Sequence, residues 1–97
     1  MDKRLNTAMK TLFHSGTRDK RKLKAKFRAR FPSLSSDEAI ALVAECRAIE
    51  DKINSIASKS FDGKPLTNSE KGFVSALPLT AELKLQLSRA AMFVQFR

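Results

Sequence analysis

The side chains of this chain that could do chemistry are mostly cationic, and they are concentrated near its start. Residues 1–30 hold eleven Lys and Arg against two Asp, which accounts for the whole net charge of +9. Residues 31–97 carry eight bases and eight acids and are neutral. Because this many positive charges repel one another unless a negatively charged partner lies opposite them, the sequence predicts an anionic partner.

The basic segment is typical of a surface that contacts phosphates, because each Lys or Arg that neutralises a phosphate releases condensed counterions. We therefore expect a non-enzymatic protein that grips duplex DNA or RNA by its backbone and regulates, packages or shields it. Stacking on splayed bases is not indicated, because Trp and Tyr are absent and most of the seven Phe are expected in apolar core stripes. These are Phe13, Phe27, Phe31, Phe73 and Phe93. The candidate contact residues are Arg18, Lys20, Arg21, Lys22, Lys24, Lys26, Arg28 and Arg30, helped by Lys3, Arg4 and Lys10.

Three other interpretations of the basic segment remain open. The leading alternative is a protein interaction module, an inhibitor, adaptor or immunity-type factor, that docks its basic face on an acidic protein. A basic amphipathic helix could also lie on an anionic membrane, although its apolar strip is narrow and has no Trp. A face that serves solubility alone is disfavoured, because such surfaces usually mix charges of both signs.

Nothing else in the sequence predicts catalysis, a metal or a cofactor. His14 has no acid near it in sequence and no second His, and three glycines form no phosphate loop. Cys46 is the only cysteine, so no disulfide forms within the chain, and we expect a buried, unreactive thiol. The acid pairs at residues 37–38 and 50–51 are interpreted as a helix start and as solvent-facing residues, respectively.

An all-α fold is expected to position the basic residues. We predict a single domain, residues 1–97, with a basic region (1–31) and a helical body (34–96) in a compact bundle of four or five helices. Leu5, Ala8, Met9 and Leu12 predict a helix over 2–13, broken at Gly16, with Thr17 as a cap for the next helix.

Residues 18–31 alternate as in a half-buried strand, but they also fit a helix with a narrow apolar stripe. Leu23, Phe27 and Phe31 are four residues apart, and no β-branched residue occurs between Arg18 and Phe31. The helix interpretation is preferred, with Pro32 ending the element and the helix lying on an edge of the bundle.

A capping box at Ser35 and Glu38 predicts the start of a long central helix over residues 36–59. Its apolar residues follow a heptad seam, widened by flanking Ile40, Val43 and Ala57. The seam either packs inside a monomer or forms a homodimer that brings two basic blocks together. The seam residues are Ala39, Leu42, Cys46, Ile49, Ile53 and Ile56.

A second capping box at Thr67 and Glu70 predicts a short helix ended by Pro78, and Thr80 begins a last helix that ends near Phe96. The apolar stripe of the last helix is expected to be Leu83, Leu87, Ala90, Ala91 and Val94. These two helices also fit a helix-turn-helix, with Lys84, Gln86, Ser88, Arg89 and Gln95 as contacts, but packing is preferred because this region is nearly neutral.

No apolar run approaches the roughly 20 residues that span a bilayer. Asp2 and the lack of a small-residue cleavage region argue against a transit peptide. We expect a soluble protein in the cytoplasm or another reducing intracellular compartment.

Overall fold

The computed structural model describes residues 2–95, and within that range all regular structure is helical. The predicted all-α bundle is therefore confirmed, with the predicted short helix after Thr67 divided into two single turns. The helices are α1 (Lys3–His14), α2 (Lys20–Arg30), α3 (Ser36–Phe61), α4 (Asn68–Lys71), α5 (Phe73–Ala76) and α6 (Ala81–Val94).

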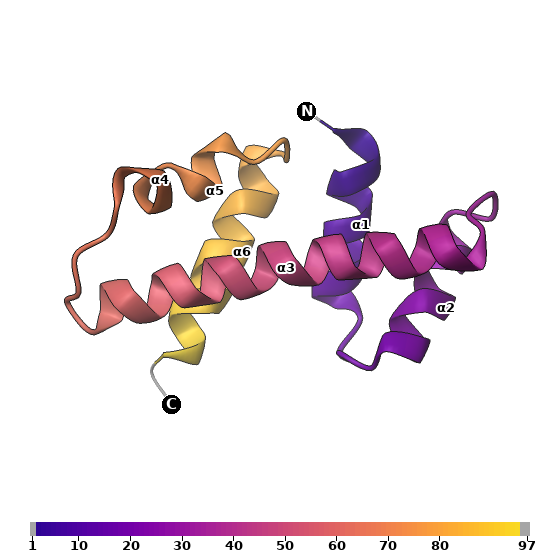
Figure 1. Ribbon diagram of the computed structural model, residues 1–97, viewed down its shortest axis with the longest axis horizontal. Coiled ribbons are helices and arrows are strands. Elements are labelled where there is room, and N and C mark those ends of the chain that lie inside the picture. Colours follow the sequence, from indigo (N-terminus) through magenta and orange to yellow (C-terminus); the bar gives the residue numbers. More distant parts are fainter. Residues whose placement is uncertain (1, 96–97) are drawn as a thin grey trace.

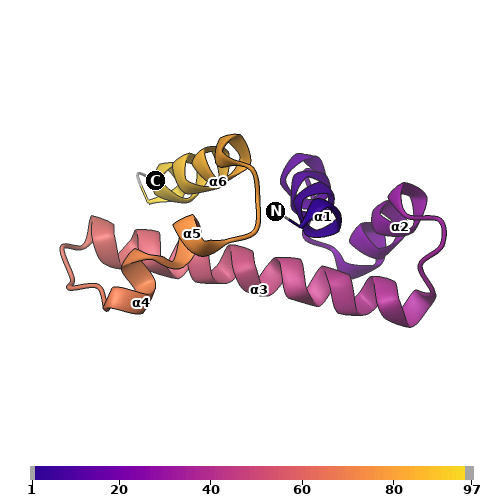
Figure 2. The same ribbon diagram turned by 90° about the horizontal axis from the view of Figure 1, so that it is seen from above.

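The fold is organised along α3. This helix has 26 residues, which corresponds to about 39 Å at 1.5 Å per residue, and the molecule measures 43 × 29 × 21 Å. Helices α2, α1 and α6 follow one another along the same side of α3 (Figures 1 and 2). The basic helix α2 packs at the N-terminal end of α3, as expected for an edge element, and α4 and α5 lie at its C-terminal end (Figure 1).

Side-chain caps define the starts of most helices. The two predicted capping boxes are both present, Ser35 with Glu38 before α3 and Thr67 with Glu70 before α4. Thr80 caps α6 as expected. The cap of α2 is Asp19 rather than the predicted Thr17. The Asp19 carboxylate accepts hydrogen bonds from the Arg21 and Lys22 N–H groups in the first turn. The Thr17 hydroxyl instead accepts a hydrogen bond from the Asp19 N–H.

The heptad seam of α3 is covered by helices of the same chain. Ala39, Leu42, Cys46 and Ile53 are buried in the core, with Ile49 packed against it. Helices α2 and α6 make the most extensive contacts with α3, and α1 also packs against it. Ile56, at the end of the seam, is only partly buried. The monomeric interpretation therefore accounts for the burial of the other five seam residues.

Three predicted core positions are wrong, and one of them, Val94 of the predicted stripe of the last helix, is 48% exposed. Ile40 was expected to widen the seam, but it is 53% exposed and lines an open groove between α3 and Lys20 of α2. Phe93 was assigned to the core and is 69% exposed. The buried row of α6 is Leu83, Leu87 and Ala91, and Phe93 lies on a different side of the helix.

The C-terminal region packs rather than forming a helix-turn-helix. The predicted short helix is divided at Gly72 into two single turns, α4 and α5. Lys84 donates to the Ser75 carbonyl at 2.7 Å, and Gln95 donates to the Ala91 carbonyl, so two of the five candidate contacts bond within the chain. Helix α6 ends at Val94, which is itself half exposed, and Phe96 lies outside the described residues.

One buried polar side chain joins the two ends of the described chain. The Asn6 side-chain oxygen accepts a hydrogen bond from the Thr80 N–H at 2.9 Å, and Asn6 is buried. The Asp2 N–H donates to the Pro78 carbonyl nearby. These bonds fix the start of α1 against the start of α6, so that the core closes around α3.

The Glu70 carboxylate generates a prediction about acid stability. It accepts from Lys59 Nζ at 2.8 Å and from the Thr67 N–H, and these bonds lower the pKa of Glu70 from 4.5 to about 2. A lowered native pKa stabilises the fold above about pH 4.5, and that contribution is lost as the pH falls towards 2. Urea unfolding followed by circular dichroism should show Glu70→Gln less stable than the wild type at pH 7, with the difference shrinking by pH 2. A difference that stays constant with pH would contradict this account.

The Cys46 thiol generates a second prediction. Cys46 is fully buried. Its pKa is raised to about 12, mainly by burial and to a smaller extent by the negative charges of Glu45 and Glu50. Because the thiolate is the reactive form, a disulfide reagent at pH 8 should modify the native protein at least about 100-fold more slowly than the urea-unfolded chain. Equal rates would show that the interior of the seam is accessible to the reagent.

Candidate nucleic-acid interface

Apolar burial determines which side of α2 faces outward. Leu23 and Phe27 are completely buried, and Phe31 packs partly against the core. These three positions are four residues apart and form one row along the helix. Their burial beside α3 orients the remaining three rows of α2 away from the core.

Two of those rows are entirely basic. One row contains Lys20, Lys24 and Arg28, and the other contains Lys22, Lys26 and Arg30. The row between them, opposite the buried residues, contains Arg21, Ala25 and Ala29, all exposed. Helix α2 therefore has a narrow outer row flanked by two rows of cations.

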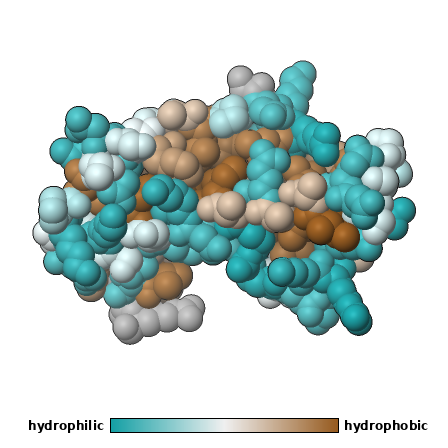
Figure 3. All heavy atoms as spheres, in the orientation of Figure 1, coloured by the Kyte–Doolittle hydropathy of each residue, from teal (hydrophilic) through white to brown (hydrophobic). Residues whose placement is uncertain are grey.

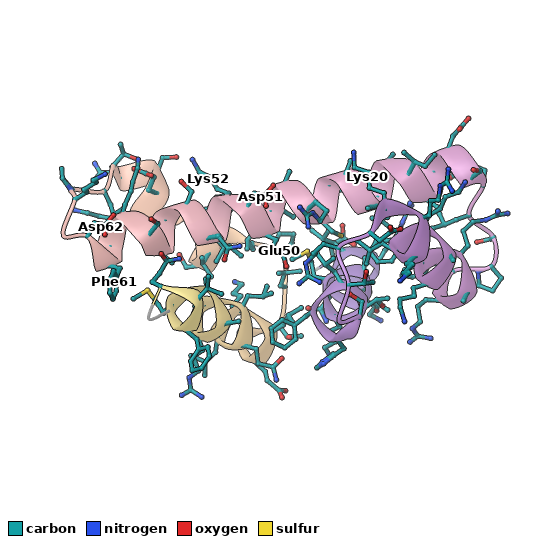
Figure 4. All side chains as sticks on the ribbon, turned by 90° about the horizontal axis from the view of Figure 1, so that it is seen from below. Lys20, Glu50, Asp51, Lys52, Phe61 and Asp62 are labelled. Atoms are coloured by element: carbon teal, nitrogen blue, oxygen red, sulfur yellow. The ribbon has the colours of Figure 1, made fainter. Side chains whose placement is uncertain are left out.

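The two basic rows lie on opposite flanks of α2. Lys20 lines a groove of about 420 Å³ together with Ile40 and other residues of α3, and Figure 4 shows Lys20 beside that helix. Lys26 and Arg30, together with Ala29 of the outer row, line a shallow groove, also of about 420 Å³, with residues of α1 that include His14. One row therefore borders α3 and the other borders α1.

The cations of α2 are not neutralised by other side chains of residues 2–95. All are exposed except Lys24, which is half-buried. None lies within ion-pair distance of a carboxylate in residues 2–95. The acids in the basic block, Asp2 and Asp19, instead accept backbone hydrogen bonds at the starts of α1 and α2. Figure 3 shows long hydrophilic side chains projecting at the α2 end of the molecule.

Three further candidates, Lys3, Arg4 and Lys10, are exposed on α1, which packs against α2. They extend the basic surface onto a second helix. Arg4 lies near Glu38, whose pKa is lowered mainly by hydrogen bonds with Ser35 and slightly by the charge of Arg4. The charge of Arg4 is therefore partly offset within the chain.

Arg18 is exposed, but unlike the cations of α2 it is paired with a carboxylate. Its guanidinium forms a two-point bond with Glu50 of α3, Nε to Oε1 at 2.8 Å and Nη2 to Oε2 at 2.7 Å. Its Nη1 also donates to the carbonyls of Thr17 and Leu12. Because Arg18 lies in the connection between α1 and α2, these bonds fasten that connection to α3, and the predicted phosphate contact is replaced by a structural one.

Glu50 was expected to face solvent, but its side chain is only 16% exposed. Figure 4 shows Glu50 on the side of α3 that faces the other helices, whereas Lys52 points away from them. Arg47 lies 3.7 Å from the same carboxylate. No local pattern predicts this pair, because Arg18 and Glu50 are 32 residues apart.

Other kinds of site have little support in the described part of the chain. Residues 2–95 contain no group of three or more His, Cys, Asp or Glu side chains that could hold a metal ion. No helix in that range is long and apolar enough to cross a membrane. His14 is exposed and makes an edge contact with the ring of Phe13.

The Arg18 bonds predict a stability effect that separates Arg18 from the cations of α2. Arg18→Ala removes charge-assisted bonds to a half-buried carboxylate and should lower the free energy of unfolding by about 1–2 kcal/mol. Lys20→Ala, which removes an exposed and unpaired charge, should change it by less than about 0.5 kcal/mol. Chemical denaturation measures both, and equal effects would contradict the structural role of Arg18.

Comparisons of the chain with protein-family models, curated proteins and solved structures find no match. The burial, charge and geometry of its own residues are therefore the basis for a functional proposal.

Proposed function

We propose that this chain is a non-enzymatic nucleic-acid-binding protein that grips the phosphate backbone of a duplex through the exposed face of α2. The observation that carries the proposal is the presence of two basic rows on opposite flanks of α2, a helix whose orientation is fixed by burial. Neither row has a carboxylate partner within residues 2–95. Regulation or shielding of the bound duplex requires no further chemistry from the chain.

The distribution of charge favours phosphate over other anions. Three cations in each row, spaced four residues apart, extend over about 12 Å of helix axis. A duplex presents two lines of phosphates, so each row has its own strand to contact. Six such contacts would release enough counterion to give a log-log salt slope of about −5.

The remainder of the surface supports a single binding face. Residues 31–97 are neutral overall, and the exposed bases of that region, such as Lys52, Lys64, Lys71 and Arg89, lie on α3, on α6 and in the region between them. A duplex attracted to the basic end would therefore bind there with a defined orientation.

Fluorescence anisotropy with a labelled duplex, titrated at several salt concentrations, tests the proposal. The variant K22A/K24A/K26A/R28A keeps two of the six row cations, so its salt slope should fall to about −2 and its affinity at 0.1 M salt should fall at least about 100-fold. Alanine preserves helix propensity, and circular dichroism should show unchanged helicity.

The matched control is K52A/K64A/K71A/R89A, which removes the same charge from exposed positions outside α2. This control should retain most of the wild-type affinity and slope. Equal losses in both variants would mean that only net charge matters. If the wild type binds no duplex at moderate salt, the proposal is wrong, and the basic face would then be tested against acidic proteins by a pull-down.

A further inference from the structure

We infer that the ligand class is B-form duplex DNA and that α2 enters its major groove. This inference rests on the proposed function and adds to it the choice of DNA over RNA and the part of the duplex that is occupied. It is carried by the arrangement of the two basic rows about the outer row of α2.

The first argument is the placement of charge around the helix. If α2 lay across the outside of one strand, cations would be most useful on its outermost row. Instead that row has a single cation, Arg21, beside Ala25 and Ala29, and the other six cations of α2 are on the two flanks. Flanking cations suit a helix that has phosphates on both sides, which is the environment inside a groove.

The second argument is size. An α-helix with its side chains is about 10–12 Å across, and the major groove of B-DNA is about 12 Å wide. Exposed Ala25 and Ala29 keep α2 thin on the side that would face the base pairs. The deep, narrow major groove of A-form RNA does not admit a helix of this kind.

The third argument is the match in length. Three cations in one row cover about 12 Å along the helix, and phosphates of one strand recur every 3.4 Å along the duplex axis. Each row can therefore follow three or four phosphates of its own strand. Between the rows only Arg21 has a long polar side chain that could reach a base edge, so we expect little sequence preference beyond a guanine near Arg21.

The position of α2 in the fold permits this approach. The helix lies at one end of the molecule, and α1 and α3 pack on its inner side (Figures 1 and 2). Leu23 and Phe27 are buried there, so the helix need not move to present its outer row. The exposed bases of α1 lie on the neighbouring helix, where they can add contacts to the backbone beside the groove.

The first test compares a 20-base-pair DNA duplex with the RNA duplex of the same sequence, by anisotropy at equal salt. We expect the wild type to bind the DNA at least about tenfold more tightly. Methyl green, which occupies the major groove, should compete with the protein, and netropsin, which occupies the minor groove, should not. Equal affinity for DNA and RNA, or competition by netropsin alone, would overturn the inference and leave the proposed function standing.

A second test uses a variant that keeps every charge. A25L/A29L thickens the outer row with good helix formers at exposed positions and should weaken DNA binding at least about tenfold, with unchanged helicity. The matched control A41L/A81L makes the same change at exposed alanines of α3 and α6 and should bind as the wild type does. Unchanged DNA affinity of A25L/A29L would rule out groove entry, whereas absence of wild-type binding to either duplex would overturn both the inference and the proposed function.

Discussion

The burial of Leu23 and Phe27 against the rest of the core is the constraint on which the basic face depends. Both side chains are completely buried, and burying a Leu or Phe fully is worth about 1.5–3 kcal/mol each relative to exposure. Because they occupy one row of α2, their burial fixes the rotation of that helix. Without it, eleven residues containing seven cations would have little reason to remain helical or to keep one orientation.

The other helices and two side-chain interactions hold α2 in this orientation. Helix α3 supplies a continuous apolar surface, and α1, α2 and α6 each bury a stripe against it. The Arg18–Glu50 bond holds the connection before α2, and Asp19 caps its first turn. The two acids of the basic block, Asp2 and Asp19, cap α1 and α2, so the cations of α2 have no carboxylate partners in residues 2–95 and the positive potential remains directed outward.

Much of this organisation follows from local sequence patterns. The capping boxes at Ser35 and Thr67 are specified within four residues, so the starts of α3 and α4 could be predicted. The four-residue spacing of Leu23 and Phe27 also identified the buried row of α2. These features depend only on residues close together in the chain, so they can be predicted from the sequence alone.

The features that sequence reasoning missed depend on contacts between distant residues. Arg18 looked like one more phosphate contact because its partner Glu50 is 32 residues away, and the bond from Thr80 to Asn6 joins residues 74 apart. Phe93 was misplaced because α6 has apolar residues on more than one side, and only the position of α3 decides which side is buried. The flanking cations were visible in the sequence, but their separation by an exposed outer row required the orientation of α2.

The most direct test of the central claim is a map of the binding surface by NMR. Amide and side-chain shifts of the labelled protein would be recorded during titration with a short DNA duplex. Binding through α2 predicts that the largest changes fall on residues 20–30, with smaller changes on the exposed part of α1 and almost none on α6. Changes centred on α6, or spread evenly over the surface, would contradict the account.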